Sequence, residues 1–316
     1  MSAASKIEWT DVSWNPVRGC SRVSEGCRFC YAERLAGRFS GPGKPYEGLT
    51  VEGPRWRRWN GEIRLLPELL NEPLRWRKPK RVFVNSMSDL FHEKVPEDFV
   101  FAVFQTMGAA FRHTYQVLTK RPDRMREVLP RISERLHAEG RVPLGPSWRH
   151  VHLGVSVEDQ ETADGRIPLL LQTPAAVHWV SYEPALGPVD FTRIGGGVLG
   201  YKAITIDALH GGGTKCEPPS PWGVDWVVVG GESGPGARPC DLAWIRSIVE
   251  QCKAANVPVF VKQLGACASD PVNGIAGAAL KVPAEAEALI SRRLRDRKGA
   301  DMNEWPADLR VREYPR

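Results

Sequence analysis

Short apolar runs that alternate with helical patterns constrain the fold of this chain more than any other feature. Six runs cover residues 81–86, 114–119, 150–156, 176–181, 225–230 and 257–262. Runs that are apolar at nearly every position are typical of strands buried on both faces, as in parallel sheets. Helical patterns cover residues 96–111, 122–139, 159–172 and 241–255. Together with a first strand just before Cys20, the alternation predicts seven βα units. We therefore expect an α/β fold, a TIM-like full or partial (β/α) barrel of six to seven parallel strands, with a doubly wound sheet as the alternative.

Two stretches interrupt this alternation. Residues 39–60 are rich in Gly, Pro, Arg and Trp, and we expect a loop on the substrate side of the barrel. Residues 187–223 contain two runs of three glycines and a pair of prolines, which are typical of an insertion or lid. We therefore predict a barrel domain over residues 1–267, with this insertion at about 187–223, followed by an appended C-terminal segment over residues 268–316.

Three cysteines, Cys20, Cys27 and Cys30, follow the expected first strand. Three thiolates can hold three irons of a cubane [4Fe–4S] cluster and leave the fourth iron open for a substrate or cofactor. Zinc is the alternative, because Cys-x2-Cys pairs are common in zinc sites, and His92 or Cys216 would then be the fourth ligand. A disulfide framework fits poorly, since the chain has seven cysteines and opens without an apolar signal segment. We therefore expect a reducing cytoplasm.

Polar or flexible residues follow each of the six apolar runs. In βα barrels the active site forms at the carboxyl ends of the strands. The three glutamates among these residues are expected either to bind ammonium or ribose groups of a ligand or to pair with the neighbouring basic side chains in a buried ionic network. The two glycines would let a ligand approach the backbone closely. The candidates are Ser86, Ser88, Asp89, Lys120, Arg121, Ser156, Glu158, Glu183, Gly230, Gly231, Glu232 and Lys262.

The net charge of +6 and the pI of about 9.0 favour an anionic partner. Arginine alternates with tryptophan in two segments, and this pattern suits phosphate contact combined with base stacking. The alternative is a solvated basic face with the tryptophans turned inward. No apolar run approaches the roughly 18 residues that a membrane span needs. The expected nucleic-acid contacts are Arg57, Arg58, Trp59, Arg75 and Arg77.

Several motifs, taken in their order along the chain, resemble a known family. IEWTDVSWNP at residues 7–16 precedes the cysteines; SMSDLFH at 86–92, LTKRP at 118–122, GVSVE at 154–158, SYEP at 181–184, GGESG at 230–234, WP at 305–306 and LRVRE at 309–313 follow. Together they resemble the phage-associated three-Cys-motif proteins, long carried as a domain of unknown function in phage and prophage genomes. That family is similar in turn to radical S-adenosylmethionine (SAM) enzymes, as a divergent branch.

This resemblance implies a cofactor arrangement. Radical SAM enzymes typically carry Cys-x3-Cys-x2-Cys after the first barrel strand, whereas the first gap here is six residues long. Tyr31 fits the aromatic residue often found after the last cysteine. The resemblance implies that the three cysteines bind a [4Fe–4S] cluster and that the open iron binds the amino and carboxylate groups of SAM. Reductive cleavage of SAM would then give a 5′-deoxyadenosyl radical.

The resemblance also implies roles for the strand-end residues and a set of partners. By position, Ser86, Ser88 and Asp89 would bind the SAM amino group, Lys120 and Arg121 its carboxylate, and Ser156 and Glu158 its ribose. An external electron donor is required. A slight resemblance to spore photoproduct lyase suggests only that a nucleic acid or nucleotide is a conceivable substrate. The expected location is the cytoplasm of a bacterium or of a phage-infected host cell.

Three functions follow from these observations. The first is a radical SAM enzyme that acts on a nucleic acid or nucleotide. The second is a non-catalytic nucleic-acid-binding protein with a structural zinc or Fe–S site. The third is a SAM-independent barrel hydrolase that uses the carboxylates of Glu158 and Glu183. Iron, zinc or neither in the purified protein would distinguish them.

Overall fold

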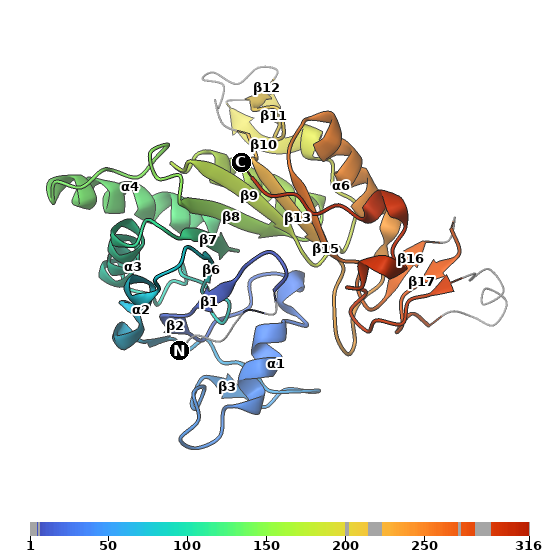
Figure 1. Cartoon of the computed structure of the whole chain (residues 1–316), viewed down its shortest axis with the longest axis horizontal. Helices are drawn as coiled ribbons and strands as arrows, with labels where there is room; N and C mark the ends of the chain where they lie inside the picture. Colours follow the sequence, from blue (N-terminus) through green and yellow to red (C-terminus); the bar gives the residue numbers. More distant parts are fainter. Residues whose placement is uncertain are drawn as a thin grey trace. The chain divides into compact units, whose positions relative to one another are not determined.

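A seven-stranded parallel sheet is the main element of the structure (Figure 1). The computed structural model describes residue 5 and residues 7–199, 202–213, 223–270, 273–281 and 292–315. The strands, in spatial order, are β1 (Val12–Trp14), β6 (Arg81–Val84), β7 (Thr114–Thr119), β8 (Val151–Val157), β9 (Val177–Tyr182), β13 (Trp226–Gly230) and β15 (Val259–Gln263). Spatial order follows chain order, as in a (β/α) barrel, and β1 and β15 end the order. The predicted partial barrel is therefore confirmed. The doubly wound alternative is wrong, because such a sheet reverses its strand order at an inner strand.

The strands lie where the apolar runs predict them, within about two residues. Every residue of β8, β9 and β13 is buried, as expected for strands covered on both faces. Two boundaries differ for local reasons. β6 ends at Val84, because Asn85 takes a positive φ of 61°. β15 begins at Val259, after Pro258, which has no backbone N–H to donate to a neighbouring strand.

The four predicted helices are present as α3 (Glu97–Ala109), α4 (Pro122–Ala138), α5 (Gln160–Leu171) and α6 (Leu242–Ala254). α4 begins with a proline, whose missing N–H is not needed in the first turn. The Asp241 side chain caps α6 by accepting a hydrogen bond from the Ala243 N–H. Two further helices are α1 (Tyr31–Arg38), directly after the cysteines, and the short α2 (Glu72–Arg75), which contacts α3.

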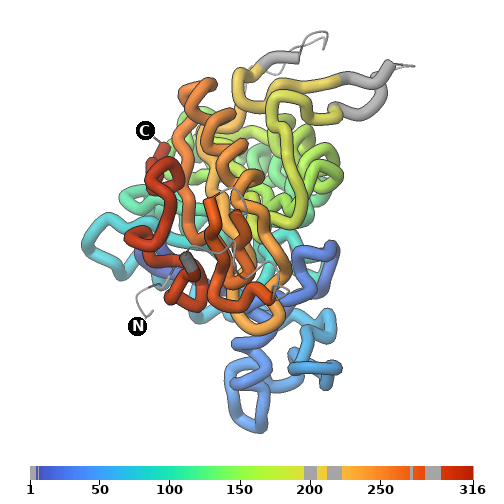
Figure 2. The backbone as a smooth tube through the Cα atoms, turned by 90° about the vertical axis from the view of Figure 1, so that its right-hand side faces the viewer, coloured from blue at the N-terminus to red at the C-terminus, as the bar shows by residue number. Residues whose placement is uncertain are grey.

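The chain divides into two compact units, residues 1–155 with 169–178 and residues 156–168 with 179–316. The first unit also contains two small ladders, in which β2 (Val17–Arg18) pairs with β5 (Arg64–Leu65) and β3 (Thr50–Val51) pairs with β4 (Arg58–Trp59). α1 contacts both β3 and β4, and Figure 2 shows these elements together as a projecting lobe of this unit. The predicted substrate-side loop thus folds against the helix that follows the cysteines.

The second unit contains the predicted insertion and the C-terminal segment. The insertion forms a three-stranded sheet of β10 (Ile194–Leu199), β11 (Lys202–Asp207) and β12 (Gly212–Gly213). A four-stranded sheet follows the order β14 (Cys240–Asp241), β16 (Ala268–Asp270), β17 (Ile275–Ala276) and β18 (Arg292–Arg293). The predicted boundary at residue 267 falls within this unit. Across the described ranges, no helix is both long and apolar enough to cross a membrane.

The end of the chain runs along the outer edge of β15. The Val261 N–H donates to the Val311 carbonyl at 2.9 Å, and the Glu313 N–H donates to the Val259 carbonyl at 3.0 Å. The C-terminal segment therefore pairs with backbone groups that would otherwise be left open at the sheet edge.

Candidate functional site

The three cysteines lie in one loop of the first unit, between β2 and α1. Gly19, just before Cys20, has a φ of +95°, and a Cβ there would lie 2.1 Å from the Glu62 carbonyl oxygen. Only glycine fits this close approach. Cys27 ends a short 3-10 turn (Glu25–Cys27), and its carbonyl accepts from the Cys30 N–H at 3.3 Å. Cys30 then begins α1, so the last two thiols are held by consecutive turns.

The thiols of Cys20 and Cys30 are held in an apolar setting. Both cysteines pack against a buried cluster of Ala32, Ala36, Leu49, Trp59 and Met87. Burial raises the pKa of both thiols; at Cys20 the negative charge of Asp89 raises the pKa further, whereas the positive charge of Arg121 lowers it. Any metal that binds these thiols must displace their protons.

Three thiols in one loop are donors that suit either an iron–sulfur cluster or a zinc ion. Within the described ranges, no three or more His, Cys, Asp or Glu side chains are arranged to hold one metal ion. His92, the predicted zinc ligand, contacts Ser21 Oγ through Nε2 at 2.9 Å and accepts the Lys94 N–H at Nδ1 at 3.2 Å. Cys216, the other predicted zinc ligand, lies outside the described residues.

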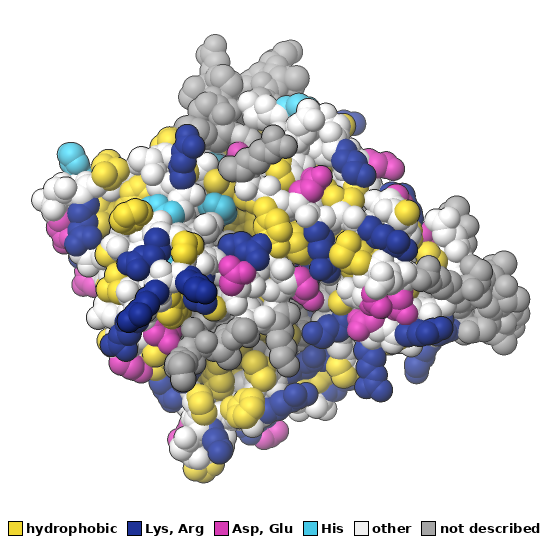
Figure 3. All heavy atoms as spheres, in the orientation of Figure 1, with side chains coloured by type: hydrophobic (Ala, Val, Ile, Leu, Met, Phe, Trp, Pro, Cys, Tyr) yellow, Lys and Arg dark blue, Asp and Glu magenta, His cyan; other side chains and the backbone are white. Residues whose placement is uncertain are grey.

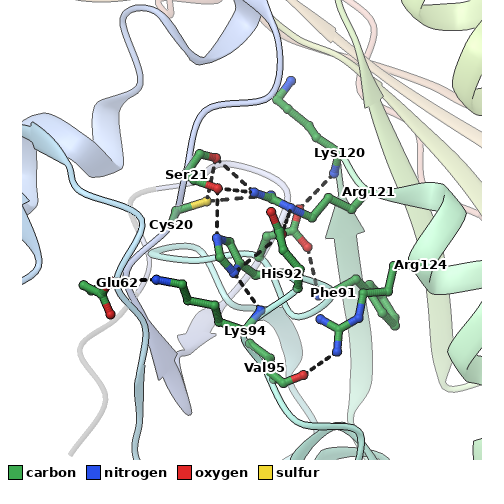
Figure 4. A network of polar contacts seen from close by, with 12 residues as sticks. Cys20, Ser21, Glu62, Phe91, His92, Lys94, Val95, Lys120, Arg121 and Arg124 are labelled. Atoms are coloured by element: carbon green, nitrogen blue, oxygen red, sulfur yellow. Dashed lines mark hydrogen bonds and ion pairs between the residues drawn. The ribbon is translucent and has the colours of Figure 1, made fainter.

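Arg121, at the end of β7, reaches the cysteine loop (Figure 4). Its Nη2 donates to Ser21 Oγ at 2.7 Å and to the Ser21 carbonyl at 3.1 Å. Its Nη1 lies 4.0 Å from Cys20 Sγ, a long N–H···S contact, and 3.3 Å from Asp89 Oδ2. The Arg121 side chain is only 9 % exposed. A buried cation therefore lies beside the first cysteine.

Asp89 is the anion that holds this cation and the surrounding loops. Its carboxylate accepts from Thr119 Oγ1 at 2.8 Å, from the Lys120 N–H at 3.1 Å and from the Phe91 N–H at 2.9 Å, besides Arg121. The residue is 6 % exposed. The predicted SAM contact at Asp89 is thus surrounded by donors of the protein itself, and the carboxylate ties the end of β6 to the end of β7.

The two predicted serines are also engaged in the first unit. Ser86 Oγ donates to Asn15 Oδ1 at 3.2 Å, and Ser88 Oγ donates to the Val17 carbonyl at 2.9 Å. The Tyr31 hydroxyl, from the start of α1, donates to the Ser86 carbonyl at 3.0 Å. The loop after β6 therefore lies directly against the segment that carries the cysteines.

Asn85 is a candidate that the sequence reasoning missed. It is 3 % exposed, and neither its Oδ1 nor its Nδ2 has a hydrogen-bond partner in the structure. An unpaired buried amide costs roughly 1–3 kcal/mol, so a ligand that supplied the missing bonds would gain that amount. The available signal was an asparagine at the end of a strand, because asparagine is enriched at positive φ.

Glu33 is a second residue that the sequence reasoning missed. It is fully buried on α1, and it accepts from Arg22 Nε at 3.1 Å and from the Trp59 N–H at 3.0 Å. Arg22 lies inside the cysteine loop and also donates to the Arg28 carbonyl at 3.2 Å. The signal was a charged residue between Ala32 and Ala36, on the face of α1 that carries small apolar side chains.

The remaining strand-end candidates lie in the second unit, where charged pairs hold them. Ser156 Oγ donates to the Glu183 carbonyl at 3.1 Å. The ion pairs are Glu158 with Arg166 at 3.1 Å, Glu183 with Lys262 at 3.0 Å and Glu232 with Arg238 at 2.7 Å. Of the basic partners predicted for the ionic network, only Lys262 appears in these pairs. Glu158 is 1 % exposed, whereas the Glu183 and Lys262 side chains are 14 % and 18 % exposed.

Two glycines of the second unit lie against neighbouring backbone. A Cβ on Gly231 would lie 2.2 Å from the Leu264 carbonyl oxygen, and one on Gly230 would lie 2.9 Å from Glu183 Oε1. The close approach predicted for this pair is therefore made by the protein itself. Cys240, Cys252 and Cys267 are buried in this unit.

The predicted nucleic-acid contacts fall into two groups. Trp59 is 9 % exposed and belongs to the buried cluster next to the cysteines, so it offers no face for base stacking. Arg57 donates to the Thr50 hydroxyl and carbonyl, both at 2.9 Å, and Arg58 is half-buried. Arg75 and Arg77 are exposed. Figure 3 shows basic side chains over the viewed face with acidic ones among them.

The fold and this site define a partial (β/α) barrel with a cysteine loop at its first strands. The chain belongs to the family described as protein of unknown function (DUF5131), whose defining pattern matches residues 4–306. Among curated protein sequences, none matches this chain.

Two solved structures are similar to parts of the chain. One is spore photoproduct lyase complexed with dinucleoside spore photoproduct, and the other is a mutant of that enzyme with bound AdoMet and the same dinucleoside. Each is 14 % identical to this chain, with a TM-score of 0.35. Each match covers 58 % of this chain and 48 % of the solved one, so the chain spans about half the length of those proteins. A likeness this low carries no argument, and the fold rests on the strand order itself.

Proposed function

We propose that this protein is a radical SAM-type enzyme that holds a [4Fe–4S] cluster on Cys20, Cys27 and Cys30. The observation that supports it most is the gathering of three thiols in one loop beside the buried cation of Arg121. Three thiolates leave one iron open, and that iron needs a ligand from outside the protein. When bound and reduced, the cluster would supply the electron that cleaves SAM into methionine and a 5′-deoxyadenosyl radical.

The residues around the loop would prepare the site for that chemistry. The apolar cluster packs against Cys20 and Cys30 and leaves these cysteines only partly exposed. The guanidinium of Arg121 offsets negative charge that gathers on the thiolates, and Asp89 holds that guanidinium in place. Each cysteine would lose its proton when iron binds, so assembly is expected to be faster at higher pH.

SAM would be bound at the carboxyl ends of β6 and β7. We assign the unpaired amide of Asn85 to SAM, because its oxygen and nitrogen lack partners at this edge. The proposal retains Ser86, Ser88, Lys120 and Arg121 around it, with Asp89 acting by positioning the β7 end. Ser156, Glu158, Glu183, Gly230, Gly231 and Glu232 of the second unit remain proposed cofactor contacts. Both Glu158 and Glu183 are paired with a basic side chain, and Glu183 is the more accessible of the two, with 14 % of its side chain exposed against 1 %.

We further propose a nucleic acid or nucleotide as substrate, an external electron donor, and the phage or prophage setting of the three-Cys-motif proteins. The support is the net charge of +6 and the exposed Arg75, at the end of α2, and Arg77, just after it. Binding of a dinucleoside is a property of the similar lyase. For this chain it only guides the choice of nucleic-acid probes in the binding experiment.

Anaerobic reconstitution tests the cluster directly. The wild-type chain should take up about four irons and four sulfides. Cys20→Ala, Cys27→Ala and Cys30→Ala should each lose most of this iron. Cys252→Ala, a cysteine on α6 of the other unit, is the matched control and should keep it. Full iron in all three loop variants would place the cluster elsewhere and remove the proposal.

The second candidate function is a non-catalytic nucleic-acid-binding protein with a structural zinc or Fe–S site. The short turn that joins Cys27 and Cys30 favours it, because such turns are common in zinc sites. Stoichiometric zinc in colourless protein, with no iron uptake on reconstitution, would support this function over the first.

A further inference from the structure

The cysteine loop is long for a segment that must present three sulfurs together. Six residues separate Cys20 from Cys27, and the only regular structure in the described loop before Cys27 is one 3-10 turn. A segment of this kind loses conformational freedom when three sulfurs must be presented together, and other contacts must offset that loss.

We propose that Arg121 and the Arg22–Glu33 pair are positioning residues that hold this loop in the shape its metal group requires. The inference rests on the proposed function for the identity of that group. The contacts themselves belong to the protein alone, and they act at both ends of the six-residue gap.

The first contact fixes the start of the gap. Arg121 binds the backbone and the hydroxyl of Ser21, the residue after Cys20, and lies beside the Cys20 sulfur. Arg121 is anchored by Asp89 and by Glu93, whose carboxylate accepts from Arg121 Nε at 2.8 Å. Ser21 is also bound by His92, so the end of β7 and the loop after β6 both hold this point.

The second contact fixes the remainder of the gap. Arg22 spans from Glu33 on α1 to the Arg28 carbonyl, which lies between Cys27 and Cys30 in sequence. Glu33 is fully buried, and it also binds the Trp59 backbone. A buried carboxylate is costly unless it is paired, so the pair is expected to keep a fixed geometry.

These contacts predict a local effect in the protein without metal. Removing either contact should let the loop open more often, which raises amide hydrogen exchange in residues 20–30 by about tenfold while the sheet exchanges as before. The variants are Arg121→Met and the double variant Arg22→Met/Glu33→Gln, which removes both charges of the buried pair. Arg131→Met/Glu97→Gln, an exposed pair between α4 and α3, is the matched control.

If one variant fails to fold, another variant can still test the role of its residues. Arg121→Met leaves Asp89 buried without its cation, so Asp89→Asn/Arg121→Met is measured alongside it. Unchanged exchange in the loop of the folded variants would overturn the proposal. Rapid exchange in the loop with the control unchanged would support it.

The metal-loaded protein gives a second, independent readout. Loss of the positive charge beside Cys20 should disfavour reduction, by about tenfold in the equilibrium constant, or about 59 mV for one electron. Arg121→Lys keeps the charge but not the forked geometry, so it should restore the potential and not the exchange. A wild-type chain that takes up no iron would defeat the proposed function, and the exchange of the metal-free loop would still decide this inference. Identical potentials in wild type and Arg121→Met would contradict the assigned contact with Cys20.

Discussion

Two acids beside the cysteines are buried and paired, and this decides what each can do. Asp89 and Glu33 hold arginines, so they shape the site from within. Asn85 differs, because it is buried with both side-chain atoms unpaired. At the scale of single residues, the open binding capacity therefore lies at the amide and not at the carboxylate that follows it.

The spacing of the cysteines could be recognised from sequence alone, but the residues that hold them could not. Arg121 and Ser21 are 100 positions apart in the chain. Nothing local to either residue indicates the contact, since it depends on β7 lying beside the first strands. Trp59 follows the second of the two alternatives given for the Arg–Trp segments, because its ring is turned inward and buried.

At the scale of single residues, the prediction concerns the variant Asn85→Gly. Glycine tolerates the positive φ of Asn85 and removes the unpaired amide, so the metal-free protein should keep its melting temperature or gain slightly. SAM affinity of the reconstituted protein should fall about tenfold, because one or two hydrogen bonds are lost. Calorimetry measures the affinity. Asn256→Gly, at the other asparagine with positive φ, should leave it unchanged; equal affinities in both variants would remove Asn85 from the site.

The elements of the fold divide into those with a periodic pattern and those without. The six later sheet strands and four long helices have patterns that could be identified from sequence. The two-residue strands β2 to β5 have no period to detect, and their pairing depends on partners 7 to 48 residues away. These small ladders nevertheless shape the loop around the cysteines.

Histidines at the start of β7 and β8 make the stability of the first unit depend on pH. Burial lowers the pKa values of His113 and His150, and it lowers the pKa of His152 to about 4. The unfolded chain takes up these protons near pH 6.5, whereas the folded chain resists them. The stability contributed by the neutral ring is complete above about pH 6.5 and is lost as the pH falls toward 4.

Protonation of His152 alone should therefore lower the free energy of unfolding by about 2 kcal/mol between pH 7 and pH 5. Urea denaturation of the metal-free protein at both values measures it. His152→Leu removes the titrating group and should flatten this pH dependence. A variant that loses stability as steeply as the wild type would show that other groups dominate.

Sequential strand order is the property of the whole molecule that the sequence predicted best. It follows from alternating strands and helices with short connections. The path of the last residues was not predicted, because residues 311–313 read as an appended tail and instead pair with β15. Backbone pairing at an edge leaves no side-chain pattern by which to recognise it.

Truncation after Leu309 tests this edge. It removes the backbone pairing with β15, the hydrogen bond from Trp226 Nε1 to the Glu313 carbonyl and the stacking of Tyr314 on Trp226. An open strand edge should lower the melting temperature and promote aggregation, seen by light scattering. Tyr314→Ala keeps the backbone pairing and should have a smaller effect. A truncated chain as stable and monodisperse as the full one would contradict the structural role of the segment.

The positive charge of the molecule predicts a second outcome, salt-dependent binding of single-stranded nucleic acid. Fluorescence anisotropy with labelled single- and double-stranded DNA and RNA should show affinity falling steeply with salt. Arg75→Ala/Arg77→Ala should weaken binding more than Arg57→Ala/Arg58→Ala, because Arg57 is bonded internally and Arg58 is half-buried. No binding at low salt, or equal losses in the two variants, would favour a small-molecule or protein substrate.

The central claim is that the cysteine loop supports reductive cleavage of SAM, and one measurement tests it most directly. Reconstituted protein is incubated anaerobically with SAM and dithionite, and 5′-deoxyadenosine is quantified by mass spectrometry. The account predicts that 5′-deoxyadenosine accumulates with the wild-type chain and not with Cys27→Ala. Protein that holds about four irons, is reduced by dithionite, and yet forms no 5′-deoxyadenosine above that variant would contradict it.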